Sequence, residues 1–161
     1  MVHPIRVETI TQHLTAAEGY LELGMLDEAA AEIEEIDYSL RLAREVLTMR
    51  ARIYHAAGAW RHLETVAVHL VREWPQDARH WVWLAAAMRK GGDPAGARVT
   101  LLRAFPEQRR SAAIHAEIAR CHCAVGELRR ARQRLGLAIA LDRGIRLALL
   151  DDPDLASVWM E

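Results

Sequence analysis

The sequence predicts an all-α protein, an α-solenoid of four tandem helix-turn-helix repeats that ends in a C-terminal capping helix. Glycines and alanines each recur at a constant step of 34 residues. The glycines are Gly24, Gly58, Gly92 and Gly126. The alanines are Ala17, Ala51, Ala85 and Ala119. Alanine is also abundant and aromatic residues make up 6% of the chain, which favours closely packed helices over strands.

Each repeat contains the signals of two antiparallel helices. The first helix is expected to end at the glycine, which adopts a left-handed conformation without steric cost. The alanine column lets this helix approach its neighbour closely. A second helix is expected to begin two residues after the glycine; in the third repeat, Asp93 and Pro94 read as an N-cap followed by proline at the first helical position. Apolar residues then recur at helical spacing. These second-helix columns include Ala29, Leu63, Ala97 and Ala131, then Ile33, Ala67, Leu101 and Leu135.

The predicted array spans residues 1–143, and a capping segment spans residues 144–161. The four repeats cover about 10–43, 44–77, 78–111 and 112–143. In the capping segment, Asp152 and Pro153 repeat the N-cap pattern and predict a short helix over 154–160. Five apolar side chains are expected to cover the open face of the fourth repeat, since terminal repeats need such a lid. They are Leu147, Leu150, Leu155, Val158 and Trp159.

The repeat resembles the tetratricopeptide repeat (TPR), whose pattern is W-x2-L-G-x2-Y, then A-x3-F, then P. The third repeat places Trp81, Leu84, Ala85, Met88, Ala97, Leu101 and Ala104 on this pattern. The second places Leu47, Ala51, Tyr54, Leu63, Ala67 and Pro75 on it. The tryptophan column departs from the pattern at His13 and His115. The resemblance covers residues 10–143 and implies two helices per repeat and a concave surface lined by the first helices.

The net charge of −1 conceals a strong segregation of charge along the chain. Residues 1–40 carry a net charge of −8, residues 41–150 carry +11, and the last eleven residues add four acids. No signal peptide or membrane-spanning run is evident. The two cysteines, Cys121 and Cys123, point to opposite faces of a helix and fit a reducing compartment, so we expect a cytoplasmic protein. Twenty arginines against one lysine indicate a bacterial origin.

No catalytic, cofactor or metal motif is evident in the sequence, so we expect a protein without enzymatic activity, cofactor or metal. Cys121-His122-Cys123 resembles a zinc site, but spacing of one residue on a helix separates the sulfurs. His115 and His122 fall in packing columns and are expected to be core histidines. Asp151, Asp152 and Asp154 are explained by helix capping rather than calcium binding.

The resemblance implies that the concave groove captures a peptide or another protein. Eight side chains of the first helices are the candidates for contact with this partner: Glu18, Glu45, Met49, Arg52, Arg79, Trp83, Arg89 and Arg120. Trp81 and Trp83 point about 200° apart on a helix, so Trp81 is expected in the core and Trp83 in the groove. The alternative for Trp83 is packing beneath the N-terminal segment or against a lattice neighbour. The carboxylate clamp of chaperone-binding relatives can be aligned on this chain from the first or from the second repeat, and neither alignment supplies the clamp residues.

Two alternatives to a protein- or peptide-binding module remain open. The acidic first repeat and the basic later repeats favour a head-to-tail homo-oligomer that acts as a scaffold. RNA binding is a weaker alternative, because the net charge is near neutral and the first repeat is acidic. The basic run over 129–134 can be a solvated helix face, a surface for an acidic protein partner or a nucleic-acid contact.

Overall fold

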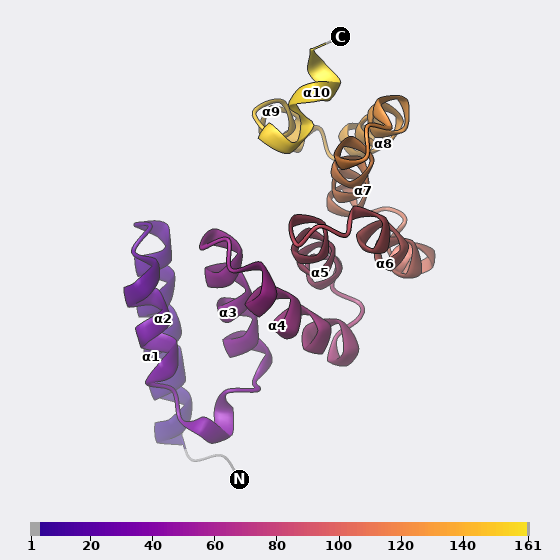
Figure 1. The fold of residues 1–161 in the computed structure, drawn as a ribbon. Helices are drawn as coiled ribbons and strands as arrows, with labels where there is room; N and C mark the ends of the chain where they lie inside the picture. Colours follow the sequence, from indigo (N-terminus) through magenta and orange to yellow (C-terminus); the bar gives the residue numbers. More distant parts are fainter. Residues whose placement is uncertain (1–3, 161) are drawn as a thin grey trace. The chain divides into compact units, whose positions relative to one another are not determined.

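The computed structural model describes the backbone of residues 4–160 and the side chains of residues 10–160 other than 105 and 107. Within this range the chain forms helices and no strands. The eight longer helices are α1 (Pro4–Glu22), α2 (Leu26–Glu34), α3 (Arg44–Ala56), α4 (Trp60–Glu73), α5 (Ala78–Lys90), α6 (Pro94–Gln108), α7 (Ala112–Ala124) and α8 (Leu128–Leu141). Shorter elements are η1 (Tyr38–Leu40), η2 (Arg143–Ile145), α9 (Arg146–Leu150), η3 (Pro153–Leu155) and α10 (Ala156–Trp159) (Figure 1).

The helices divide into two compact parts, which are described separately below. The N-terminal part spans Met1–Val66 and the C-terminal part spans Ala67–Glu161, so that α4 begins in one part and ends in the other. The predicted second helices α2, α4, α6 and α8 all begin two residues after a repeat glycine. The all-α solenoid with two helices per repeat is therefore confirmed.

The same hydrogen-bonded turn closes the first helix of every repeat. Each repeat glycine has a positive φ, from +65° at Gly58 to +101° at Gly92. The residue after each glycine donates its backbone N–H to a carbonyl five residues earlier, as from Asp93 to Met88 over 2.9 Å. The glycine itself donates to the carbonyl three residues earlier, as from Gly92 to Arg89 over 3.1 Å. These two bonds form a Schellman motif, which satisfies carbonyls that the helix end leaves without partners.

The predicted packing columns are buried throughout the array. All four alanines of the first-helix column are fully buried. The second-helix columns that begin at Ala29 and Ile33 are also buried in every repeat. In the N-terminal part, Ile33 of α2 and Ile36, just after α2, pack with Val46 and Ile53 of α3. In the C-terminal part, Leu101 of α6 packs with residues of α5 and α7.

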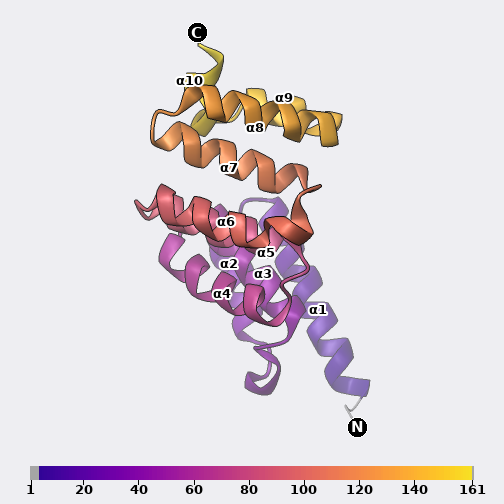
Figure 2. The ribbon, with the colours of Figure 1, turned by 90° about the vertical axis from the view of Figure 1, so that its right-hand side faces the viewer.

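The capping segment covers the end of the C-terminal part, where α9 and α10 lie beside α8 (Figure 2). Leu155 and Val158 are buried against α7 and α8, as expected. The expectation for Leu147 and Leu150 is wrong, because both side chains are exposed. Leu149 occupies the core instead, since α9 is a single short helix that presents one side chain inward. Trp159, also expected in the lid, is 39% exposed, and it donates its indole N–H to the Leu149 carbonyl over 3.2 Å.

Replacing the turn glycine Gly126 with alanine is expected to lower the free energy of unfolding by about 1–2 kcal/mol, the cost of left-handed backbone for an L-residue. No heavy atom lies within 4 Å of an added Cβ at Gly126, so the cost comes from its φ of +75°. Gly136→Ala is the matched control, because Gly136 lies inside α8 with equally open space. The free energy of unfolding of that control is expected to rise by roughly 0.5–1 kcal/mol. Urea denaturation of both variants tests the pair, and a loss of equal size in both would contradict this account.

Candidate functional site

The eight candidate contact residues lie on the first helices of the repeats. Glu18 is on α1, and Glu45, Met49 and Arg52 are on α3, all in the N-terminal part. Arg79, Trp83 and Arg89 are on α5, and Arg120 is on α7, in the C-terminal part. The placement on first helices agrees with the repeat pattern, and most of these side chains have partners within the chain.

In the N-terminal part, the guanidinium of Arg52 pairs with the carboxylate of Glu18. Nη2 of Arg52 donates to Oε1 of Glu18 over 2.6 Å, and Nη1 donates to Oε2. The hydrogen bonding from Arg52 lowers the pKa of Glu18 below its ordinary value. Met49 is only 6% exposed and packs in the core between α1, α2 and α3. Glu45 is exposed at the start of α3.

The two tryptophans of α5 have different surroundings. Trp81 packs against the core around α5, α6 and α7, and its indole N–H donates to the Pro75 carbonyl over 2.7 Å. Trp83 is partly exposed, and its ring stacks on that of His80 with centroids 6.0 Å apart and planes tilted by 27°. His80 is fully buried, with Nδ1 3.0 Å from the Trp74 carbonyl oxygen. One face of the Trp83 ring therefore packs on a buried side chain.

Arg89 and Arg120 hold a buried carboxylate between them. Glu117 of α7 is 2% exposed. Nε of Arg89 donates to its Oε1 over 2.8 Å, and Nη1 of Arg120 donates to its Oε2 over 3.0 Å. The side chain of Arg89 is itself only 6% exposed. A buried carboxylate is costly unless it is paired and hydrogen-bonded, and both oxygens of Glu117 meet this condition.

The same two arginines also bind the acidic stretch of the capping segment. Arg89 donates to Asp154 over 2.9 Å, and Arg120 donates to Asp152 over 2.6 Å. Lys90 completes the contact by donating to the other oxygen of Asp154 over 2.7 Å. We call these six side chains the carboxylate network. They are Arg89, Lys90, Glu117, Arg120, Asp152 and Asp154.

Two members of this network also have local roles. Asp152 caps the short η3 helix by accepting the backbone N–H of Asp154 over 2.9 Å, as its Asp-Pro pattern predicts. Burial raises the pKa of the Asp154 carboxyl, but the hydrogen bond from Lys90 and the charge of Arg89 outweigh burial and lower that pKa. The capping segment is thus held by charge as well as by apolar packing.

Sequence reasoning did not identify this network. It assigned Arg89 and Arg120 to the groove and explained the aspartates by capping alone. One usable signal was the four acids of the last eleven residues beside the basic later repeats. Another was the column Met49, Trp83 and Glu117, in which a carboxylate replaces bulky side chains at the 34-residue step.

The remaining polar candidates differ in exposure and in their partners within the chain. Arg79 is largely exposed and pairs with Asp77, the N-cap of α5, over 2.7 Å. His115 and His122 are buried core residues, as expected; their ring nitrogens lie 3.0 Å from the Arg109 carbonyl oxygen and 2.6 Å from a Glu127 oxygen. Cys121 and Cys123 are free thiols, and burial raises the pKa of Cys121 to about 12. A thiol with so high a pKa is a poor nucleophile at neutral pH.

Two further properties concern the described residues only. Over the described range, no group of three or more His, Cys, Asp or Glu side chains is arranged to hold a metal ion. The helices described here are too short or too polar for any one of them to cross a membrane.

Replacing Glu117 with glutamine is expected to lower the free energy of unfolding by roughly 3 kcal/mol or more, because it leaves the buried Arg89 and the partly buried Arg120 without their shared carboxylate. Glu45→Gln on the exposed start of α3 is the control and should change stability by less than about 0.5 kcal/mol. Urea denaturation measures both. Similar small losses in the two variants would show that the network adds no net stability.

The carboxylate network also predicts a pH dependence. Because the pKa of Asp154 is lowered in the folded chain, its stabilising effect is full above the ordinary aspartate pKa of about 3.9 and is lost as the pH falls through the lower folded-state value. Asp154→Asn should therefore cost about 1–2 kcal/mol at neutral pH and nothing in strong acid. Thermal melts between about pH 2 and about pH 7 compare it with Asp151→Asn, whose exposed side chain makes it a neutral control. A cost for Asp154→Asn that stays constant with pH would contradict the assignment.

The arrangement of the helices has parallels among known structures. No protein-family model matches the sequence, and no curated protein matches it. Among solved structures, the chain is similar to TTC0263, a thermophilic TPR protein in Thermus thermophilus, with a TM-score of 0.77 and 21% sequence identity over 92% of this chain and 80% of that one. It is also similar to MamA MSR-1 C2, with a TM-score of 0.66 and 14% identity over 88% of this chain and 99% of that one. The chain therefore has the fold of a TPR-like helical repeat protein.

Proposed function

We propose that this chain is a non-enzymatic module that binds a peptide or a protein through the first helices of its repeats, with Trp83 as the central apolar anchor. The TPR-like fold supports a role in protein interactions in general. The observation that carries the finer proposal is the partly exposed Trp83 ring stacked on the buried His80. A tryptophan that is already fixed in place loses little conformational freedom when a partner covers it, and tryptophan is a frequent interface hot spot.

The carboxylate network reduces the set of groove residues that a partner would contact. Arg89 and Arg120 bind Glu117 and the aspartates of the capping segment. In our proposal they shape the surface rather than contact the partner directly. Arg79, which is largely exposed on the same helix as Trp83, is the cation that a partner would meet first. In the N-terminal part, Glu45 is the exposed candidate, and Met49 acts through packing.

The chemistry of the proposed partner follows from these side chains. An apolar side chain would pack on Trp83, and a neighbouring acidic side chain would pair with Arg79. The proposal excludes a chaperone tail held by a carboxylate clamp, because the corresponding positions include Leu14, Glu18 and Met49 rather than the required donors. We place the protein in the cytoplasm, where its two free thiols would stay reduced.

A head-to-tail scaffold is the second candidate function, and the segregation of charge favours it. Residues 1–40 are strongly acidic, whereas residues 41–150 are strongly basic. Opposite ends of two copies would attract each other, and such a contact would weaken as salt screens the charges. Light scattering at low and high salt distinguishes this candidate, because a chain that stays monomeric at low salt and high concentration cannot form the scaffold.

The peptide-binding proposal is tested with a displayed peptide library selected on the wild-type chain. Trp83→Ala is expected to lower the affinity for the selected peptides by about 30-fold or more, which corresponds to about 2 kcal/mol of binding free energy, without loss of helicity. Calorimetric titration measures the affinity and circular dichroism the helicity. Tyr38→Ala is the control, because Tyr38 is the exposed aromatic of η1. Selected peptides that bind Trp83→Ala as tightly as wild type would overturn the proposed site.

A further inference from the structure

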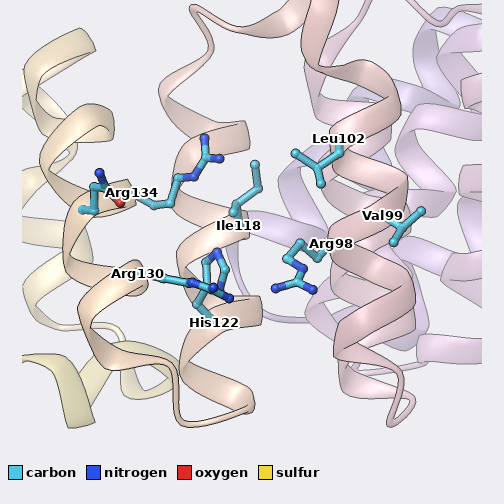
Figure 3. A pocket seen from close by; sticks show the side chains of 8 residues that line it. Arg98, Val99, Leu102, Ile118, His122, Arg130 and Arg134 are labelled. Carbon is cyan, nitrogen blue, oxygen red and sulfur yellow. The ribbon is translucent and has the colours of Figure 1, made fainter.

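A cleft of about 320 Å³ lies between the second helices α6 and α8 of the C-terminal part, above α7. Figure 3 shows Arg98 and Leu102 reaching from α6 toward α7, and Arg130 and Arg134 reaching from α8. The buried side chains of Ile118 and His122 on α7 form its floor. The eight lining residues are Arg98, Val99, Leu102, Ile118, His122, Arg130, Gln133 and Arg134.

The described residues that line the cleft carry an excess of positive charge. Three of the eight described lining residues are arginines, and none of the eight is acidic. Glu127, at the start of α8, accepts from both Arg130 over 2.8 Å and Arg98 over 3.3 Å. Nη1 of Arg134 lies 3.3 Å from a ring nitrogen of His115. One carboxylate thus pairs with two of the three arginines.

Exposed aliphatic side chains stand beside these arginines. Val99 is 53% exposed and Leu102 is 44% exposed, both on the α6 wall. Ile118 continues the apolar surface into the floor. A wall of aliphatic carbon next to guanidinium groups suits a ligand that carries an aliphatic side chain close to a carboxylate.

The repeat itself does not require basic residues at these positions. Arg130 and Arg134 correspond to Glu28 and Glu32 in the first repeat, three steps of 34 residues earlier. Both carboxylates occupy the same places on α2 that the arginines occupy on α8. Either charge is therefore compatible with the fold at these positions, and the repeat pattern does not explain the arginines of α8.

We propose that the cleft between α6 and α8 binds an acidic peptide segment of a partner protein, with carboxylates on Arg98, Arg130 and Arg134 and an aliphatic side chain on Val99 and Leu102. The arginines and exposed aliphatic side chains of this surface lie on the second helices α6 and α8, whereas Trp83 lies on the first helix α5. The two sites are therefore independent, and each has its own test.

Charge and shape favour an acidic peptide over a nucleic acid. Single-stranded nucleic acids bind through aromatic platforms on which bases stack, in addition to basic grooves. Among the described lining residues the only ring is the imidazole of His122, which is buried and bonded to Glu127. Aliphatic walls offer a base no such platform, while they do bury a leucine or isoleucine side chain.

The test uses a fluorescent library of acidic decapeptides with leucine, isoleucine, valine or serine at the centre, measured by anisotropy. We expect members with an aliphatic centre to bind more tightly than those with serine, and binding to weaken with salt. The double variant Arg130→Ala and Arg134→Ala should weaken binding at least about tenfold. The matched double variant Arg129→Ala and Arg143→Ala removes two exposed arginines that do not line the cleft, and it should bind within about twofold of wild type.

Further variants and competitors separate the cleft from other binding surfaces and other ligands. Leu102→Ser should remove the preference for an aliphatic centre while leaving the serine peptides unaffected. Trp83→Ala should leave binding to the cleft unchanged, so that failure of one site does not count against the other. The proposal is overturned by equal losses in the two double variants or by no binding of any library member at low salt. It is also overturned if polyuridylate RNA displaces the peptides more strongly than its charge predicts. Self-association of the chain through the cleft, measured by light scattering, would likewise overturn it, because the acidic residues of a second copy would then be the occupant.

Discussion

The left-handed glycine at the end of each first helix is the constraint on which the array depends. Gly24, Gly58, Gly92 and Gly126 all have positive φ, and each turn is closed by the same pair of backbone hydrogen bonds. The turn reverses the chain within two residues, so that the second helix starts at a fixed position. Only then do the fully buried alanines bring the paired helices close enough to exclude water.

Charge sets a second level of organisation in the C-terminal part. The apolar cap of Leu149, Leu155 and Val158 covers α7 and α8, but apolar contacts alone specify position weakly. The buried carboxylate of Glu117 adds directional hydrogen bonds, because each of its two oxygens accepts from one arginine and so orients that arginine. The polar network and the apolar cap therefore select the same placement of the last residues.

The sequence predicted the backbone architecture well and the side-chain partnerships poorly. Turns and buried columns repeat every 34 residues, so four copies of each signal support one another. Arg89 meets Asp154 across 65 residues, and no periodicity connects these two positions. For the same reason the cleft between α6 and α8 appeared in the sequence only as a basic run, since Arg98 and Leu102 come from another repeat. Leu149 could not be distinguished from Leu147 or Leu150 without the geometry of α9.

The reach of Arg89 has a consequence for how the protein unfolds. Repeat arrays are commonly treated as one-dimensional chains in which each repeat couples only to its neighbours, so that ends fray stepwise. Arg89 and Lys90 of the third repeat bind Asp154 of the cap and so connect elements that flank the fourth repeat. Separating the cap therefore also removes the contacts that Arg89 and Lys90 of the third repeat make with Asp154. We therefore expect the third repeat, the fourth repeat and the cap to unfold more cooperatively than independent modules would.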